Sequence, residues 1–382
     1  MPELRRHERL LLRATPAGWP REPGPAGATR ERGVSRGVRR QGARGSVGFA
    51  ACRASRRAPR SCTLVALLCA LLAATGCVSL DVPFRGGPGP LSETVVQGEH
   101  GPKVLLLDID DVITESDRPG PLGFGGREST VARVREQLDL AREDPEVKGL
   151  LLRIQSPGGT VTGSDVVYHE ILRFKKDRSV PVIAQLMGTA TSGAYYVAMS
   201  ADSVYAHPTT VTGSIGVILS SVNFSGLMQK LGIADQSVKS GSRKDTGSMM
   251  RPMTPEERAQ LQSVIDDLYA RFRSVVAQGR PKLEAQRLTT LADGRIYSAP
   301  QALAAGLVDG IQYLPDTIDE MKRRLGATDV RVVSYHRRRE VRENIYSMPP
   351  VPDVVRVELA PPGLGPRLEG PAFLYLWWPG GE

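Results

Sequence analysis

The chain has 382 residues and a formal charge of +9 at pH 7, and that charge is unevenly spread. Residues 1–60 hold 15 Arg, no Lys and four Glu, whereas the rest of the chain carries two more acidic than basic groups. A nearly neutral body excludes a broad basic surface for nucleic acid. All four cysteines lie in the first 77 residues, which excludes a cysteine nucleophile or disulfide framework from the rest. The five histidines lack HxH or HxxxH spacing, so we expect no metal site and no cofactor.

Residues 51–77 have the pattern of a lipoprotein signal peptide. Four Arg at 53–60 precede the apolar run TLVALLCALLAA, which is followed by Thr75-Gly76-Cys77. The run is too short for a permanent membrane span, which needs about 20 residues. The ending resembles a bacterial lipobox and implies lipidation of Cys77; an ordinary signal peptide and a signal anchor are the alternatives. We expect a lipid-anchored protein on the periplasmic side of a bacterial cell envelope, and the Val after Cys77 favours the outer membrane over the inner.

The rest of the chain divides into segments that differ in amino-acid composition. Residues 1–50 are rich in Arg, Gly and Pro and are expected to be a non-native or unstructured extension. The Gly- and Pro-rich residues 78–101 are predicted to form a flexible tether. Residues 102–325 form the predicted folded domain, and residues 326–382 form a Pro-rich and aromatic C-terminal tail.

Apolar strands alternate with helices in the first half of the folded domain. Continuous apolar runs predict buried strands at 103–114, 147–155 and 181–186, and helical spacing predicts helices at 130–145 and 162–177. Strands separated by helices of this length indicate an α/β fold with a largely parallel sheet.

The second half is expected to mix strands, turns and helices. The longest helix is predicted over 254–278, with Thr254 as its N-cap and Glu257 completing a capping box. The other predicted elements are a strand and turn at 202–218, a helix at 225–233, a strand at 235–241 and a helix near 315–325.

Three Gly-rich segments each follow a strand: 156–164, 189–196 and 210–217. In open parallel sheets such segments meet beyond the carboxyl ends of the strands, where ligands bind. Ser192 in the second segment is therefore a candidate nucleophile, although a serine there could instead cap a helix. Gly158 and Gly159 could offer backbone N–H groups to an oxyanion. A phosphate-binding loop is disfavoured because neither GxxxxGK[ST] nor GxGxxG occurs at these turns.

A serine nucleophile needs a base. His207 precedes a proline in a predicted turn, where a structural role is expected. Lys239 and Lys244 lie in the Gly/Ser-rich stretch VKSGSRKDTG. A lysine can act as a base once it is neutral, and burial favours the neutral form. From the residues alone, solvated loop charges are the alternative.

Taken together, SPGGTV, TATSGAYYVAMSAD, TGSIGVI and SGSRKDTGS resemble the SppA family of serine proteases, across residues 102–325. The resemblance implies a single catalytic domain with a ClpP/crotonase-like fold, a spiral of ββα units. It also implies a Ser–Lys dyad that hydrolyses extended apolar peptides such as signal-peptide remnants. Family members with a single core assemble into homo-oligomeric rings whose subunits jointly build the substrate grooves.

The resemblance assigns roles to five residues. Ser192 corresponds to the nucleophile and Lys244 to the general base, and Ser214 to the serine that orients the lysine amine. Gly159 and Gly193 correspond to the oxyanion-hole residues. The chain departs from the family at Ala194, where Gly is frequent, and this change should be tolerated.

Two other functions are compatible with the same fold. A crotonase-like acyl-CoA enzyme would use the oxyanion glycines without a serine nucleophile, and a non-catalytic lipoprotein would only retain the fold. The secretion signal disfavours the first of these, because it leads away from cytoplasmic CoA. The intact Ser192, Lys244 and Ser214 disfavour the second.

The tail contains two distinctive stretches. Residues 336–344, HRRREVREN, are expected to be an exposed basic run. The chain closes with PAFLYLWWPGGE, which includes Trp377 and Trp378. Leaving so many apolar side chains in water is unfavourable. Three placements stay open: an added strand on the body, contact with a lipid interface, or docking in the substrate groove.

Overall fold

The computed structural model describes residues 89–117, 128–337, 340, 342–347 and 372–377. The predicted extension, the signal peptide with Cys77, and Trp378 lie outside these described residues. No helix in the described part of the chain is both long and apolar enough to span a bilayer.

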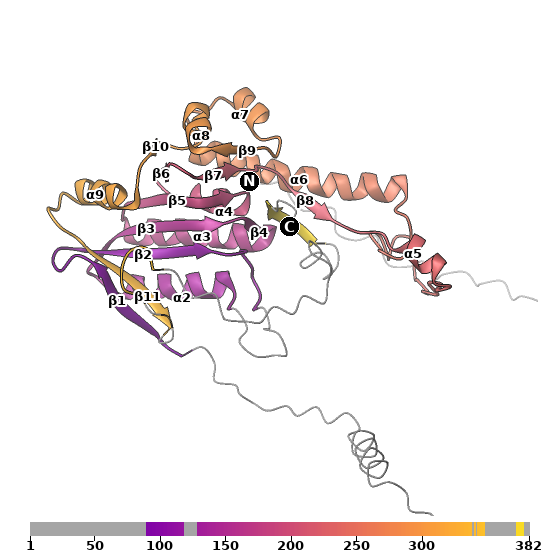
Figure 1. The fold of residues 1–382 in the computed structure, drawn as a ribbon, viewed down its shortest axis with the longest axis horizontal. Helices are drawn as coiled ribbons and strands as arrows, with labels where there is room; N and C mark the ends of the chain where they lie inside the picture. The colour runs from indigo at the N-terminus through magenta and orange to yellow at the C-terminus, as the bar shows by residue number, and fades with distance from the viewer. Residues whose placement is uncertain (1–88, 118–127, 338–339, 341, 348–371, 378–382) are drawn as a thin grey trace, which may run out of the picture. The chain divides into compact units, whose positions relative to one another are not determined.

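A nine-stranded sheet forms the centre of the fold (Figure 1). Its middle contains four parallel strands: β2 (Lys103–Asp110), β3 (Val147–Ser156), β5 (Val182–Thr191) and β6 (Ser203–Ala206). The first three are the continuous apolar runs of the sequence, as expected of strands that are covered on both faces.

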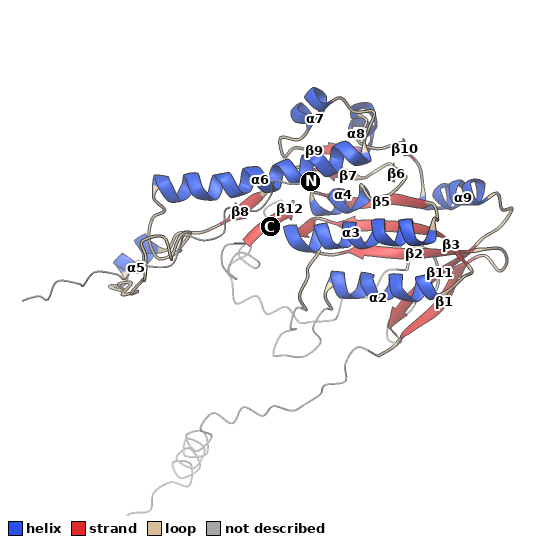
Figure 2. Ribbon diagram, turned by 180° about the vertical axis from the view of Figure 1, so that it is seen from behind, coloured by secondary structure: helices blue, strands red, loops and turns tan. Residues whose placement is uncertain are grey.

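Helices cover both faces of this sheet. On one face lie α2 (Thr130–Glu143) and α3 (Val161–Arg178), which Figure 2 shows side by side over the strands. Their apolar side chains form one core with alternate residues of the strands, such as Leu105 and Leu152. On the other face, α9 (Leu314–Leu325) packs on the strand residues that alternate with these, such as Leu106.

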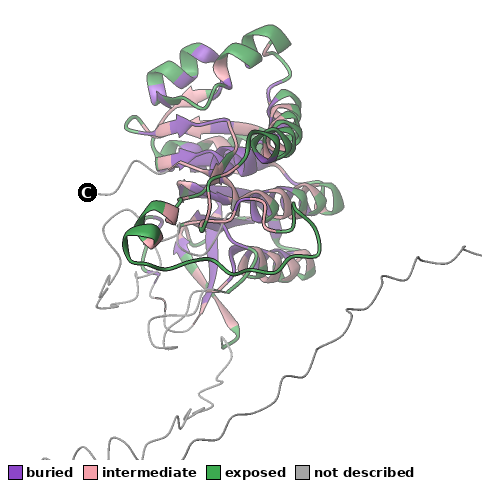
Figure 3. Ribbon diagram, turned by 90° about the vertical axis from the view of Figure 1, so that its right-hand side faces the viewer, coloured by how far each residue is buried: buried purple, intermediate pink, exposed green. Residues whose placement is uncertain are grey.

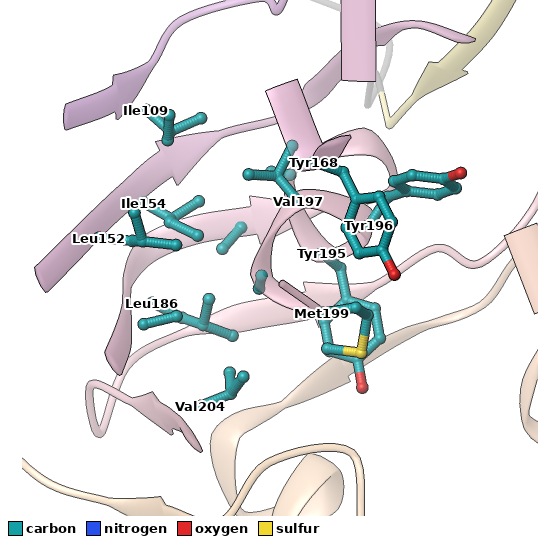
Figure 4. Close-up of a cluster of buried hydrophobic side chains, with 14 of the residues drawn as sticks. Ile109, Leu152, Ile154, Tyr168, Leu186, Tyr195, Tyr196, Val197, Met199 and Val204 are labelled. Atoms are coloured by element: carbon teal, nitrogen blue, oxygen red, sulfur yellow. The ribbon is translucent and has the colours of Figure 1, made fainter. Parts of the chain in front are cut away.

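The predicted α/β fold of ββα units is confirmed. The short strand β4 (Gly158–Thr160) turns off the end of β3 and leads into α3. In the same way β5 leads into α4 (Gly193–Ala198), whose Tyr195 and Tyr196 join the apolar cluster at the strand ends (Figure 4). The carboxyl end of β5 also pairs with β7 (Val211–Gly213).

Several short elements complete the domain. The strand β9 (Ile296–Ser298) pairs antiparallel with β7. The others are α7 (Ala285–Leu291), α8 (Ala299–Ala305) and β10 (Gly310–Ile311), which pairs with β6.

The folded domain is longer at both ends than the sequence predicted. Residues expected in the tether form β1 (Leu91–Gln97), which pairs antiparallel with β11 (Arg331–Arg337) from the predicted tail. β11 in turn pairs with β2, so both strands belong to the central sheet. The predicted tether boundary at 101 and the domain boundary at 325 were therefore wrong. The Gly and Pro residues near 85–90 led us to predict a tether for a stretch that contains a short strand. The partner of this strand lies more than 230 residues away in the sequence.

Of the basic run 336–344, the basic residues His336, Arg337 and Arg342 are described and none of them is exposed, so the predicted exposure was wrong for these three. Arg342 is buried and donates to Oδ2 of Asp108 at 2.7 Å, while the buried Arg153 donates to Oδ1 of the same carboxylate at 2.7 Å. Arg153 also donates to the carbonyl oxygen of Ser347 at 2.7 Å. Buried charges need such partners, and a basic run alone does not show which acidic group will pair with it.

The long helix is α6 (Pro255–Gly279), with the predicted capping box of Thr254 and Glu257 in place. Residues 221–254, which we call the arm, precede it and contain the helix α5 (Ser225–Lys230). Figure 1 shows the arm at the outer end of α6, and most of it is exposed in Figure 3. The strand predicted at 235–241 is absent: these residues are exposed and have no regular structure.

Candidate active site

Ser192 lies at the junction between β5 and α4. Its backbone has φ 53° and ψ −117°, a region that non-glycine residues rarely adopt. Its N–H donates to the carbonyl oxygen of Gly213 at 2.7 Å, which fixes this conformation. Its hydroxyl makes no capping bond to α4. The helix-cap interpretation of Ser192 is therefore wrong.

The glycine after Ser192 is required by close packing. A Cβ atom on Gly193 would lie 2.3 Å from Oγ of Ser164 and 3.1 Å from the amide nitrogen of Gly159. Ser164 is held in place on α3, because its hydroxyl donates to the carbonyl oxygen of Thr160 at 2.9 Å. No pattern in the sequence pointed to Ser164, because its closeness to Gly193 depends on the packing of α3 beside α4.

The structure distinguishes between the two candidate oxyanion glycines of β4. On one edge of this strand, Ile113 donates to the Gly158 carbonyl oxygen at 2.9 Å, and the Thr160 amide donates to the Ile113 carbonyl at 3.0 Å. Backbone groups alternate between the edges of a strand, so the N–H of Gly159 is directed to the opposite edge. The N–H of Gly158 already donates to Oγ of Ser156 at 3.1 Å. Gly159 is thus the residue whose amide faces the Ser192 side.

Ser214 is brought to the same place. It directly follows Gly213, the acceptor of the Ser192 N–H, and its own N–H donates to the Arg295 carbonyl oxygen at 2.7 Å. Ser214 is buried and has φ 51°. The three Gly-rich segments therefore converge as predicted. His207 instead bonds to Thr209 in its own turn, which agrees with the structural role expected for it.

Lys244 is the predicted site residue that the fold does not bring to Ser192. Its side chain is exposed, and its loop is tied to the start of α6. Ser192 lies near the other half of that helix, where Tyr196 packs against Phe272 with ring centroids 5.1 Å apart. From Glu257 to Phe272, 15 residues of helix at 1.5 Å per residue span about 22 Å. Within one chain, Lys244 and Ser192 are therefore far apart.

The C-terminal aromatic segment occupies the site. Strand β12 (Ala372–Leu376) lies between β4 and β8 (Ile218–Ser220) and pairs antiparallel with both. We call the space between those two strands the β4–β8 gap. The added-strand alternative for the tail is thus confirmed, and the place where the strand is added is next to Ser192.

The register of β12 places one carbonyl group beside the glycine amides. Tyr375 is paired with Gly159, and Leu376 with Gly158. A Cβ atom on Gly158 would lie 2.0 Å from the Tyr375 carbonyl oxygen and 2.7 Å from the Gly193 nitrogen, so these two atoms are close neighbours. The Trp377 N–H then donates to the Pro157 carbonyl at 2.8 Å. The arrangement has the features needed for acyl transfer: a hydroxyl, two neighbouring glycine amides and an extended backbone with a carbonyl group beside them.

Comparison with known proteins gives the class and the family. The family model for peptidase family S49 matches residues 174–328. A putative signal peptide peptidase SppA of Enterococcus faecium is 36% identical over 252 residues, which cover 66% of this chain and 72% of that protein. A putative protease of Synechocystis is 41% identical over 167 residues, 44% of this chain and 59% of the relative. Among solved structures, a membrane-bound stomatin-specific protease aligns with a TM-score of 0.37 and 14% identity, covering 58% of this chain and 86% of the other.

The family model and the similar curated proteins define a serine peptidase. The chain belongs to the SppA signal peptide peptidases of peptidase family S49.

Proposed function

We propose that the protein is a membrane-tethered serine endopeptidase that uses a Ser192–Lys244 dyad to cleave extended apolar peptides, such as the remnants of cleaved signal peptides. The observation that carries the proposal is the β4–β8 gap, which holds a peptide strand with one carbonyl beside the amides of Gly159 and Gly193. A substrate bound in the same way adds a strand to the sheet, so its backbone supplies affinity and its side chains supply specificity.

The proposed reaction gives each of these residues one role. Oγ of Ser192 attacks the substrate carbonyl carbon, and the Lys244 amine accepts the hydroxyl proton. The negative charge that develops on the carbonyl oxygen is stabilised by the N–H groups of Gly159 and Gly193. The C–N bond then breaks as Lys244 returns the proton to the leaving amine. Water hydrolyses the acyl-enzyme, with Lys244 again acting as the base. Ser214 orients the lysine amine.

The dyad is completed by a second copy of the chain in this proposal. The loop that carries Lys244 is tied to Glu257 at the start of α6, about 22 Å along that helix from Phe272, which packs beside the Ser192 region. We therefore propose that a neighbouring protomer supplies Lys244. Contacts of this head-to-tail kind form a ring when the rotation between neighbouring copies closes, and a homo-oligomeric ring is what the family resemblance implies.

Apolar side chains on the arm and on the residues that flank it support such an interface. Seven of the large hydrophobic residues that are exposed in the described chain lie between residues 218 and 264, and Val238 is 99% exposed. The seven are Ile218, Leu227, Leu231, Ile233, Val238, Met250 and Val264. Large exposed apolar side chains gathered in one segment are typical of a protein–protein contact. Light scattering tests this part of the proposal, because a strictly monomeric and fully active enzyme would contradict it.

Arg251 is expected to hold the Lys244 loop in position. Its guanidinium donates to Oδ1 of Asp245 at 2.8 Å, to Oδ2 at 2.9 Å and to Oε2 of Glu257 at 2.8 Å. These hydrogen bonds lower the pKa of Glu257 to about 2 and also lower the pKa of Asp245. Because both folded-state pKa values are depressed, the clamp is complete above about pH 4.5 and is lost only as the pH falls toward 2.

Replacing Arg251 with Gln should therefore lower kcat/KM by roughly 10-fold near neutral pH, because a bidentate charged clamp is lost. The control is Arg258→Gln, which makes the same charge change at an exposed position of α6. Peptide hydrolysis and thermal unfolding are measured together. Equal activity of the two variants would contradict a positioning role for Arg251.

The membrane tether is proposed to be the lipidated Cys77. Cells labelled with a palmitate analogue should incorporate it into the wild-type protein and not into Cys77→Ser. The same comparison on separated inner and outer membranes tests the proposed outer-membrane location. An unlabelled wild-type protein would contradict lipidation and leave the peptidase proposal intact.

The peptidase function is tested by incubating the full-length protein with extended apolar peptides and with a fluorophosphonate probe. Cleavage of the peptides, and labelling that maps to Ser192, are expected. An acyl-CoA enzyme or a non-catalytic lipoprotein would give neither. Because enzymes of this family can resist some serine reagents, peptide cleavage is the deciding result.

A further inference from the structure

The two candidate oxyanion donors come from different elements, and one buried side chain contacts both elements. Gly159 belongs to β4 and Gly193 to α4. The side chain is that of Ser164, near the start of α3, which is 0% exposed. Its hydroxyl donates to the carbonyl oxygen of Thr160, the residue after Gly159, at 2.9 Å. A Cβ atom on Gly193 would lie 2.3 Å from the same hydroxyl oxygen.

Space, and not backbone conformation, keeps a side chain off Gly193. This glycine is the first residue of α4 and has a negative φ, which any residue can adopt. Besides the Ser164 oxygen, an added Cβ atom would meet the amide nitrogen of Gly159 at 3.1 Å. The two glycines and the Ser164 hydroxyl therefore meet at one point, and the hydroxyl limits how closely the start of α4 approaches α3.

The proton of the Ser164 hydroxyl is already used. A hydroxyl carries one proton, and that of Ser164 is donated to the Thr160 carbonyl oxygen. Ser164 is therefore not a third donor to an oxyanion. Its acceptor is itself fixed, because the Thr160 N–H donates to the Ile113 carbonyl oxygen at 3.0 Å, and the Thr160 hydroxyl accepts from the Gly163 N–H at 3.0 Å. The Ser164 oxygen thus has a defined position relative to β4.

We infer that Ser164 is a positioning residue for the oxyanion site: it holds the first residue of α4 at a set distance from β4 and so fixes the separation of the Gly159 and Gly193 N–H groups. This inference rests on the proposed peptidase function, because it adds a residue to the same site. Donors stabilise a developing negative charge only when they are aimed at the place where that charge forms. Their separation therefore affects the transition state more than the binding of substrate.

Ser164→Ala should lower kcat for an extended apolar peptide by roughly 10- to 100-fold and leave KM within about twofold of the wild type. The shorter side chain leaves a gap behind Gly193, into which the start of α4 can shift. A shift of about 1 Å at a reacting site costs up to about 100-fold in rate. The pH dependence of kcat should stay unchanged, because the variant retains Lys244, the proposed base.

Ser200→Ala is the matched control. Ser200 is also buried, and its hydroxyl donates to the Val197 carbonyl oxygen at 2.7 Å, beyond the C-terminal end of α4. Both variants lose one buried hydrogen bond, so their melting temperatures should fall by a similar few degrees. Only Ser164→Ala should lose activity, and equal kcat values in the two variants would overturn the inference.

A double-mutant cycle tests the contact between the two residues. Gly193→Ala should be inactive, because its Cβ atom meets the Ser164 oxygen. In a Ser164→Gly background that oxygen is gone, so the same substitution should cost at least about 10-fold less activity. An equal loss in both backgrounds would contradict the contact. If Ser164→Ala does not fold, Ser164→Cys replaces it: the larger sulfur pushes Gly193 away from α3, and a similar loss of kcat is expected.

Hydrogen exchange of the full-length protein separates this inference from the peptidase proposal. If the wild type cleaves no peptide, the peptidase proposal fails, and the positioning role is then judged from deuterium uptake alone. Uptake at residues 157–163 and 192–196 should rise roughly twofold or more in Ser164→Ala and stay at the wild-type level in Ser200→Ala, because only the first variant loses the support between β4 and α4. Unchanged uptake in both segments would then overturn the inference. If the wild type cleaves peptides and Ser164→Ala matches it, the inference alone fails.

Discussion

Replacing Ser192 with Ala is expected to abolish peptide hydrolysis while leaving the fold intact. The hydroxyl is the only group lost, and it makes no capping bond to α4, so its removal disturbs little. Loss of a nucleophile that works as a unit with its base lowers kcat by roughly four orders of magnitude or more. Hydrolysis of an extended apolar peptide and the melting temperature are the two measurements.

Ser263→Ala is the matched control, because it removes an exposed serine hydroxyl from the middle of α6. It should retain wild-type activity. Near-normal activity of Ser192→Ala would show that another residue is the nucleophile. The assignment of Gly159 and Gly193 as oxyanion donors would then also have to be revised, because both are defined by their position around Ser192.

Lys244→Arg should be as inactive as Lys244→Ala. Arginine keeps the positive charge and most of the length of the side chain, but its guanidinium does not lose a proton in any accessible pH range, so it cannot act as a base. The comparison therefore separates proton transfer from simple charge or packing. An activity loss of several orders of magnitude is expected in both variants.

Lys230→Arg, at an exposed position of α5 on the same arm, controls for changes in the surface of the arm. Light scattering should give the same assembly for all of these variants. Substantial activity in Lys244→Arg would contradict the general-base assignment, whereas a change of assembly would point to an interface role for Lys244.

The central strands and the convergence of the Gly-rich segments could be predicted from the sequence because their signals are local. A continuous apolar run such as 147–155 predicts a buried strand, and small residues after it predict a turn at the carboxyl end of the sheet. The same two patterns, an apolar run followed by small residues, place Ser192 at the carboxyl end of the sheet. The choice between Gly158 and Gly159 could not be predicted in this way, because it depends on which edge of β4 contacts Ile113.

The parts that could not be predicted depend on partners distant in the sequence. β1 pairs with β11, which lies more than 230 residues later in the sequence. Arg342 is buried only because Asp108 is available to pair with it. Nothing in the segment AFLYL shows that it pairs with both β4 and β8 instead of another edge. Lys244 could be recognised from its motif, yet its distance from Ser192 follows from the direction of α6, which local sequence does not specify.

The proposed sharing of the dyad between copies is tested most directly by mixing two inactive proteins. Ser192→Ala protomers keep Lys244, and Lys244→Ala protomers keep Ser192. If each site takes its serine from one protomer and its lysine from the next, random exchange at equal amounts makes about one quarter of the sites complete. The mixture should then recover about that fraction of wild-type peptide hydrolysis. A mixture that stays inactive, although native mass spectrometry shows mixed assemblies, would contradict a dyad formed between copies of the chain.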